Sequence, residues 1–155
     1  MAGPSSIAPA IFYQDPMRAL DWLQKAFGFE LSMLITDAEG RLGHSQVTWG
    51  DGYIMVGTEW DDDLRSPASV GGKNTQTVHI RLAPDDGDID AHCERARAAG
   101  AEIIQEPSTQ FYGDRTYRCR DPEGHVWTFA QPRVTVTRAE AEAASGLTIQ
   151  APDWE

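Results

Sequence analysis

Cysteine is scarce in this sequence, and long apolar runs are absent. The two cysteines, Cys93 and Cys119, form no CxxC pair, so a disulfide scaffold is excluded and only a single disulfide stays open. No apolar run reaches the roughly 20 residues that a membrane-spanning helix needs. Residues 1–7 lack the basic and apolar segments of a secretory signal. We therefore expect reduced thiols and a cytoplasmic location.

Basic residues are also few. The chain has 13 Lys and Arg against 24 Asp and Glu, which gives a formal net charge of −11. Such a surface repels nucleic-acid phosphates and anionic lipid, so we expect neither nucleic acid nor a membrane as a partner. A glycine-rich phosphate loop, a Ser-centred nucleophile elbow and zinc-type Cys/His spacing are absent as well. The length, 155 residues, suffices for one domain with a full core.

The apolar periodicity predicts the same order of elements twice. In the first half we expect a strand, a helix and three strands, at residues 7–13, 17–27, 29–36, 41–49 and 53–57. The helix is favoured by Asp15 and Pro16 at its start and by Gly28 at its end. The polar residues 60–74 are expected to form a loop. The second half then predicts a strand, a helix and three strands, at residues 75–83, 88–99, 101–106, 111–120 and 125–131.

This repeat predicts an α+β fold in which two βαβββ modules form a curved mixed sheet with a central cup. We expect one domain over residues 1–131, with module 1 at about 6–58 and module 2 at about 75–131. Residues 132–155 form a C-terminal extension in this interpretation.

The extension has a recognisable helix start. Residues 137–140 form a capping box that begins with Thr137 and ends with Glu140, which predicts a short helix. The last residues, 147–155, are expected to be loose or to dock on a partner chain through Trp154.

Four segments of the sequence resemble one superfamily. They are ALDWLQKAFGFE (19–30), GHSQVTWGDGYIMVG (43–57), DIDAHCERARAAGAEI (88–103) and YGDRTYRCRDPEGHVWTF (112–129). In this order and spacing they resemble the glyoxalase/bleomycin-resistance/dioxygenase superfamily, the vicinal oxygen chelate proteins, and within it the PhnB-like members. The resemblance covers about residues 7–131 and implies paired βαβββ modules and, commonly, a homodimer. It implies no single reaction, because the superfamily includes lyases, isomerases, dioxygenases, thiol transferases and non-catalytic drug binders.

Many enzymes of this superfamily hold a divalent metal with His, Gln or Glu side chains from four strands of the cup. At the first, second and fourth of these positions the sequence has Ala8, Met55 and Thr128. His79 fits the third position, with Thr77 as the competing choice. One imidazole without a carboxylate is a weak site for a hard divalent ion, so we expect no metal cofactor.

The resemblance and the strand pattern together indicate which side chains line the cup. In residues 41–49, one face of the strand has His44, Gln46 and Thr48 and the other has core residues. Aromatic and methionine side chains in the cup suit a flat apolar or aromatic ligand. The candidate ligand-binding residues are His44, Gln46, Thr48, Tyr53, Met55, His79, Arg81, Tyr112, Arg115, Tyr117 and Thr128.

Some of these residues suggest more than passive binding. Arg81 and Arg115 offer positive charge to an anionic ligand, or else form surface salt bridges. His44 and His79 are the candidate catalytic residues, because imidazole suits acid–base chemistry near neutral pH. With Gln46 they also stay open as a non-standard metal site.

The leading hypothesis is a metal-free protein that binds a small hydrophobic or aromatic molecule in the cup, as the bleomycin-resistance branch does by sequestration. The first alternative is a metal-dependent lyase, isomerase or dioxygenase of the glyoxalase type that uses a non-standard site or acid–base chemistry. The second alternative is a non-catalytic interaction subunit whose partner binds residues 134–155.

Overall fold

The computed structural model describes residues 5–155. The predicted lack of a secretory signal falls partly on residues 1–4, which lie outside the described residues. The helices and strands are β1 (Ala10–Tyr13), α1 (Pro16–Phe27), β2 (Glu30–Thr36), β3 (Leu42–Trp49), β4 (Gly52–Thr58), β5 (Val78–Arg81), α2 (Ile89–Ala98), β6 (Glu102–Thr109), β7 (Asp114–Arg120), β8 (Val126–Pro132) and α3 (Arg138–Ser145).

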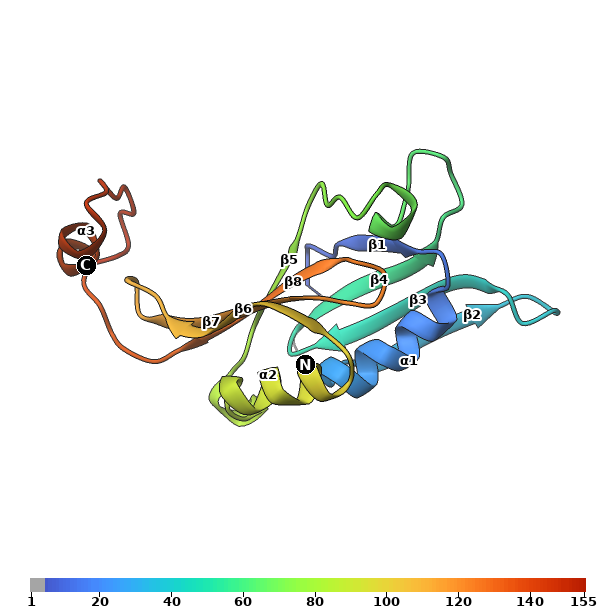
Figure 1. Ribbon diagram of the computed structural model, residues 1–155, viewed down its shortest axis with the longest axis horizontal. Helices are drawn as coiled ribbons and strands as arrows, with labels where there is room; N and C mark the ends of the chain where they lie inside the picture. Colours follow the sequence, from blue (N-terminus) through green and yellow to red (C-terminus); the bar gives the residue numbers. More distant parts are fainter. Residues whose placement is uncertain (1–4) are drawn as a thin grey trace.

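The strands form two four-stranded sheets. Sheet A has the order β1-β4-β3-β2, and sheet B has the order β5-β8-β7-β6 (Figure 1). Strand β1 pairs in parallel with β4, and β5 pairs in parallel with β8. The other neighbouring strands are antiparallel. The predicted α+β fold of two βαβββ modules is confirmed, with one sheet for each module.

Helix α1 begins and ends where the sequence predicts. The Asp15 carboxylate accepts a hydrogen bond from the backbone N–H of Arg18 at 3.1 Å, and Pro16 occupies the first helical position. Gly28 follows the last turn with a left-handed φ of 85°, and its N–H donates to the carbonyl of Gln24. These two ends fix the direction in which the chain enters β2.

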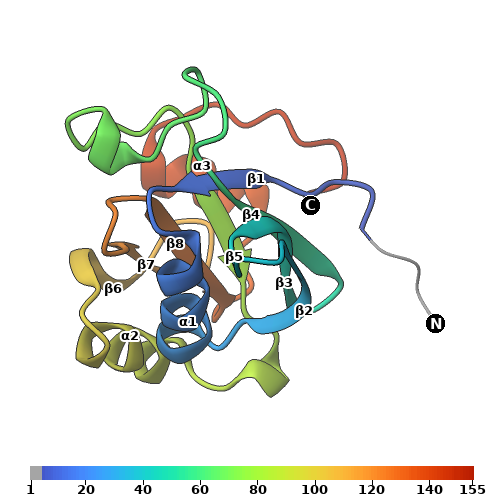
Figure 2. The same cartoon turned by 90° about the vertical axis from the view of Figure 1, so that its right-hand side faces the viewer.

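One hydrophobic core joins the two modules. Helices α1 and α2 lie side by side, and the indole N–H of Trp22 in α1 donates to the carbonyl of Ala99 at 2.8 Å (Figures 1 and 2). The ring of Phe27 lies 5.3 Å from that of Trp127 and 4.7 Å from that of Phe129, both in β8. All three side chains are fully buried. Because the helices pack on one face of each sheet, the opposite faces are turned away from this core, and we call them the outer faces.

A buried carboxylate also links the modules. Asp121, in the turn before β8, accepts hydrogen bonds from the phenol of Tyr13 at 2.7 Å and from the indole of Trp127 at 3.0 Å. Its other oxygen accepts from the backbone N–H groups of Glu123 and His125, each at 3.0 Å. The single carboxylate therefore connects β1 of module 1 with the β7–β8 turn of module 2.

The segment at residues 60–74 is irregular, as predicted, but it is held by polar contacts. The hydroxyl of Ser66 donates to the carboxylate of Glu123, and the backbone N–H of Ser66 donates to the carboxylate of Glu59, both at 2.7 Å. A short 3-10 turn at Pro67–Ser69 is its one helical element.

The C-terminal extension folds on itself. Thr137 and Glu140 form the predicted capping box of α3. The indole N–H of Trp154 donates to the carbonyl of Val136 at 2.8 Å, so this side chain binds within its own extension. Figure 1 shows α3 apart from both sheets, and within residues 5–155 it has no substantial contact with another helix or strand. No helix of these residues is long and apolar enough to cross a membrane.

Candidate ligand-binding site

The outer face of sheet A has the side chains that the alternation predicts. Ser45 and Val47 are buried toward the helices, and their neighbours in β3 point outward. Cross-strand register places these neighbours beside outward residues of β2 and β4. The outer face of sheet A thus includes Met33, Ile35, His44, Gln46, Thr48, Tyr53 and Met55, with Glu30 beside Thr48 and Ala10 beside Met55.

Strand β2 adds apolar surface that the sequence analysis did not assign to the site. Every residue of β2 is exposed. The exposed fractions are 38% for Leu31, 42% for Met33, 42% for Leu34 and 51% for Ile35. Four neighbouring large aliphatic residues at one sheet edge mark a surface suited to an apolar ligand or a protein partner.

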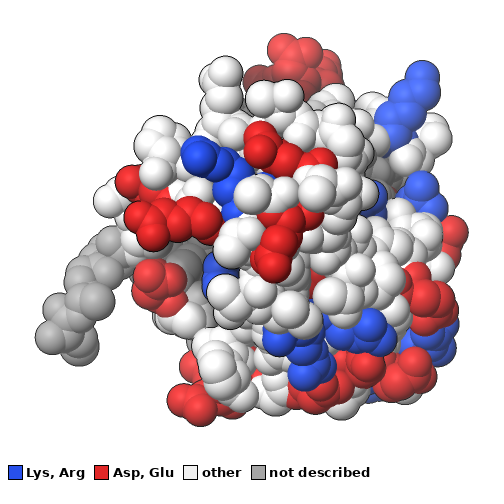
Figure 3. All heavy atoms as spheres, turned by 90° about the vertical axis from the view of Figure 1, so that its left-hand side faces the viewer, with Lys and Arg blue, Asp and Glu red and all other residues white. Residues whose placement is uncertain are grey.

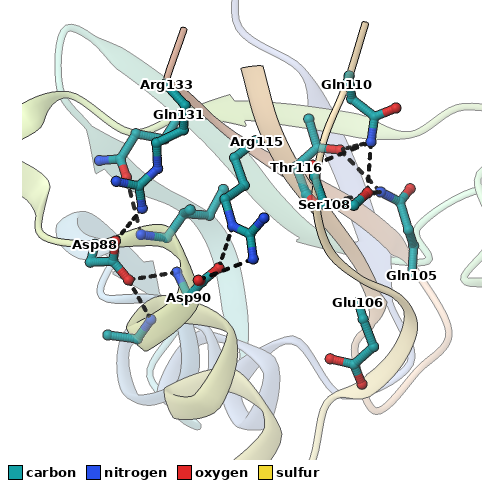
Figure 4. Close-up of polar contacts among 12 residues, drawn as sticks. Asp88, Asp90, Gln105, Glu106, Ser108, Gln110, Arg115, Thr116, Gln131 and Arg133 are labelled. Atoms are coloured by element: carbon teal, nitrogen blue, oxygen red, sulfur yellow. Dashed lines mark hydrogen bonds and ion pairs between the residues drawn. The ribbon is translucent and has the colours of Figure 1, made fainter. Parts of the chain in front are cut away.

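The outer face of sheet B is polar. Register places His79 of β5, Thr128 of β8, Arg118 of β7 and Gln105 of β6 in one row across the four strands. The Nε of Arg118 donates to the hydroxyl of Thr128 at 3.1 Å. Beside this row, the Gln105 amide donates to the hydroxyl of Thr116 at 3.0 Å (Figure 4). Arg118 was not among the predicted site residues, although its alternation with two inward neighbours is a signal for an outward side chain.

A cavity of about 870 Å³ lies where the two sheets meet, between the β3–β4 turn and the end of β5. The indole N–H of Trp49 donates to the carbonyl of Arg81 at 3.1 Å and so joins the two sides of this cavity. Of the predicted site residues, Tyr53, His79 and Arg81 line the cavity. His44 and the other outer-face residues of β3 lie along sheet A outside it.

Two predicted site residues lie on the core side of sheet B. Tyr117 is fully buried, and its phenol forms a 2.6 Å hydrogen bond with Nδ1 of His92 in α2. Arg115 forms an ion pair with Asp90 at 2.7 Å, which holds it at the first turn of α2 (Figure 4). Both follow from strand parity, because residues 115 and 117 point to the same face as the buried Cys119.

Tyr112 is also separate from the outer faces. It lies in the turn between β6 and β7, is 39% exposed, and contacts Phe111 edge-to-face at 5.1 Å between ring centroids. The structure does not bring it to the other candidate residues.

The strand register aligns the metal-ligand positions that the resemblance implies. His79 pairs with Thr128 in sheet B, and the equivalent parallel pair in sheet A is Ala10 with Met55. By this register Ala10 is equivalent to His79, and Ala8 is equivalent to Thr77. The set of positions that contains His79 is therefore Ala10, Met55, His79 and Thr128. Methyl, thioether, hydroxyl and one imidazole do not suit a hard divalent ion. Within residues 5–155 no group of three or more His, Cys, Asp or Glu side chains is placed to hold a metal.

The thiols are not activated for nucleophilic chemistry. Both cysteines are free and fully buried. Burial raises the pKa of Cys93 to about 11 and that of Cys119 to about 12. Because the thiolate is the reactive form, neither side chain is a nucleophile near neutral pH.

The charged surface is mixed. On the face in Figure 3, which views the end of the molecule that has α3, basic side chains lie among acidic ones without a continuous basic area. Ion pairs form around α2, such as Arg97 with Glu106 at 2.7 Å and Arg133 with Asp88.

Comparison with known proteins agrees with this architecture. The family model described as Glyoxalase/Bleomycin resistance protein/Dioxygenase superfamily matches residues 6–129. An uncharacterized protein of Mycobacterium bovis is 29% identical over 147 residues, which cover 90% of this chain and 91% of the relative.

Solved structures share the fold. TioX from Micromonospora sp. ML1 is 35% identical with a TM-score of 0.66, over 83% of this chain and 98% of that chain. TnmS3, an antibiotic binding protein from Streptomyces sp. CB03234, is 22% identical with a TM-score of 0.61, over 85% of this chain and 98% of that chain. The paired βαβββ modules and the family match over most of the chain establish that this protein belongs to the glyoxalase/bleomycin resistance protein/dioxygenase superfamily.

Proposed function

We propose that the protein binds a small hydrophobic or aromatic molecule at its outer faces, in the cytoplasm and without a metal. Its role in this proposal is sequestration, not catalysis. The observation that carries the proposal is the outer face of sheet A, where Met33, Ile35, Tyr53 and Met55 form an accessible apolar and aromatic surface, with Met55 at one of the metal-ligand positions.

The chemistry of this surface suits such a ligand. Methionine is flexible and polarisable, and tyrosine offers a flat ring with a polar tip, so both adapt to aromatic compounds. The neighbouring cavity of about 870 Å³ falls within the range of small-molecule sites. A few polar groups at its edge, such as Tyr53 and His79, would fix the orientation of a ligand.

We also propose a homodimer that closes the site. A single chain leaves β2 exposed on both sides, with aliphatic side chains between 38% and 51% accessible. A second copy that covers this strand would remove that surface from water at a gain of about 25 cal/mol per Å².

The antibiotic-binding description of TnmS3, which shares the fold, supports a small-molecule ligand of the kind proposed here.

Fluorescence titration with the neutral aromatic probe N-phenyl-1-naphthylamine tests this function. We expect saturable binding that weakens about tenfold in Met55→Gln, because a buried methionine contributes about 1.5–3 kcal/mol. The matched control is Met17→Gln, since Met17 is 38% exposed on α1, at the opposite face of sheet A. An absence of saturable binding, or equal losses in the two variants, would contradict the proposal.

A further inference from the structure

Two arginines on the outer face of sheet B, Arg81 and Arg118, have no acidic partner within residues 5–155. Six arginines of residues 5–155 form ion pairs with carboxylates, namely Arg41, Arg65, Arg97, Arg115, Arg120 and Arg133. Arg118 is exposed, and within residues 5–155 no carboxylate lies within 4.0 Å of it. Arg118 differs from Arg81 because its guanidinium forms a side-chain hydrogen bond on this face.

The guanidinium is held in place. Its Nε donates to the hydroxyl of Thr128 at 3.1 Å, and Thr128 is only 7% exposed. This bond uses one of the five N–H groups of Arg118 and leaves its two terminal nitrogens available to an oxyanion. Because the Thr128 hydroxyl accepts from Arg118, its own proton remains available as a further donor.

Other groups in the same row extend the donor set. His79 lies on the far side of Thr128 from Arg118, so about 10 Å separates the backbones of these two residues across three strands. Arg81 lies two residues after His79 in β5, on the same face and about 7 Å from His79 along the strand.

The acidic groups of this face do not neutralise Arg118. Strand register and alternation place Glu102 and Asp114 on the outer face of sheet B. Glu102 forms an ion pair with Arg120 at 3.1 Å. Asp114 lies at the start of β7, four residues from Arg118 and about 13 Å along the strand.

We infer that Arg118, Thr128 and His79 form the anion-binding part of the ligand site. The ligand class is an organic anion, a hydrophobic or aromatic compound with a carboxylate or a similar oxyanion. This inference rests on the proposed function and adds a specific chemical group to it. His79 lines the same cavity as Tyr53 of sheet A, so in this inference the apolar outer face of sheet A takes the ring system and sheet B takes the charge.

Surface ion pairs are individually weak, so the two parts depend on each other. An exposed guanidinium–carboxylate contact contributes little in water. Apolar contacts that exclude water around the bound anion strengthen the contact, because the effective dielectric falls. Affinity for an anionic compound should therefore exceed affinity for its neutral counterpart only where an apolar surface is also present.

A pair of fluorescent probes separates the two contributions. 1-Anilinonaphthalene-8-sulfonate has the ring system of N-phenyl-1-naphthylamine with an added sulfonate. We expect the sulfonate probe to bind about tenfold more tightly, and Arg118→Gln to abolish this difference without a change in the affinity of the neutral probe. Thr128→Val should reduce the difference in part, and added salt should weaken only the anionic probe.

Arg120→Gln is the matched control, because Arg120 lies on the same face and already pairs with Glu102. We expect less than about a twofold change in either probe for this variant. Thermal unfolding checks that each variant is folded. We expect folded variants, because the replaced arginines are not in the core. If the neutral probe binds and the sulfonate probe binds no more tightly, or if Arg118→Gln leaves the difference intact, the inference is overturned and the proposed function stands. If neither probe binds saturably, both are overturned.

Discussion

Replacement of Tyr13 by phenylalanine removes one hydrogen bond from the buried Asp121 carboxylate and leaves the aromatic ring in place. The phenol is 1% exposed and donates to Asp121 at 2.7 Å. Three donors remain, from Trp127 and from the backbone N–H groups of Glu123 and His125. Because a hydrogen bond to a charged group contributes about 1.5–3 kcal/mol, we expect a loss of about 2 kcal/mol in the free energy of unfolding near neutral pH. The melting temperature should fall by about 4–8 °C for a chain of this size.

The same variant has an expected pH dependence. Burial raises the pKa of Asp121 above its ordinary value, and the bond from Tyr13 opposes this rise. A raised pKa means that the folded state keeps the proton to higher pH than the unfolded state, so this group's contribution to stability falls as pH rises from about 4. In Tyr13→Phe the pKa rises further, and the fall is larger. Below about pH 4 the carboxyl of Asp121 is protonated in both proteins. The difference in the free energy of unfolding between wild type and variant should therefore shrink there to about 1 kcal/mol.

Urea unfolding of both proteins across this pH range measures the effect. Tyr53→Phe is the control, because Tyr53 is half-buried and its phenol has no hydrogen-bond partner within residues 5–155. We expect less than about 0.5 kcal/mol for that variant. Equal losses in the two variants, or a Tyr13→Phe deficit that is the same at all pH values, would refute the assignment of Asp121 as a charged link between the modules.

Three further predictions concern other buried groups and the metal positions. Burial lowers the pKa of His92, so the folded state binds fewer protons than the unfolded state below about pH 6.5. The free energy of unfolding should therefore decrease as the pH is lowered below about 6.5. Chemical denaturation of His92→Gln should lack this decrease, and an unchanged decrease would contradict the burial argument. Cys93 and Cys119 should react with Ellman's reagent at less than about 0.1 thiol per folded chain and fully in denaturing urea, whereas rapid native labelling would show that the thiols are accessible. After incubation with Ni, Mn, Fe, Co and Zn, elemental analysis should give less than about 0.1 metal per chain; a value near one that is lost in His79→Ala would favour the enzymatic alternative.

The fold could be predicted from the sequence where turn residues and the alternation of apolar and polar residues indicate the same element. Asp15, Pro16 and Gly28 bound α1 in the structure as the capping rules predict. In β3, strict alternation between glycine-rich turns placed His44 and Gln46 on the face opposite the core. Local chemistry determines these features, so the sequence alone is sufficient for them.

The site was less predictable from the sequence, because packing determines which face of a strand is buried. Tyr117 and Arg118 alternate, and either face was open to the ligand until the packing of α2 and the bond from Tyr117 to His92 determined which one is internal. In β2 the residues Leu31 to Ile35 are apolar on both sides, so periodicity gives no direction there. The strand predicted at residues 101–106 continues to Thr109 as β6, because an edge strand tolerates the missing N–H of Pro107.

The separation of α3 from the two sheets has a consequence for the cooperativity of unfolding. Backbone bonds from Arg133 and Val134 to the carbonyl of Gly113 attach the start of the extension to the β6–β7 turn. Residues 137–155 are held by the capping box and by the Trp154–Val136 bond, so we expect their opening to be uncoupled from the melting of the shared core. Tryptophan fluorescence then sums two events, one from Trp154 in the extension and one from the four tryptophans of residues 5–131, Trp22, Trp49, Trp60 and Trp127. A Trp154→Phe background would leave the core transition as a single two-state signal and would make the unfolding free energies of the other variants directly comparable.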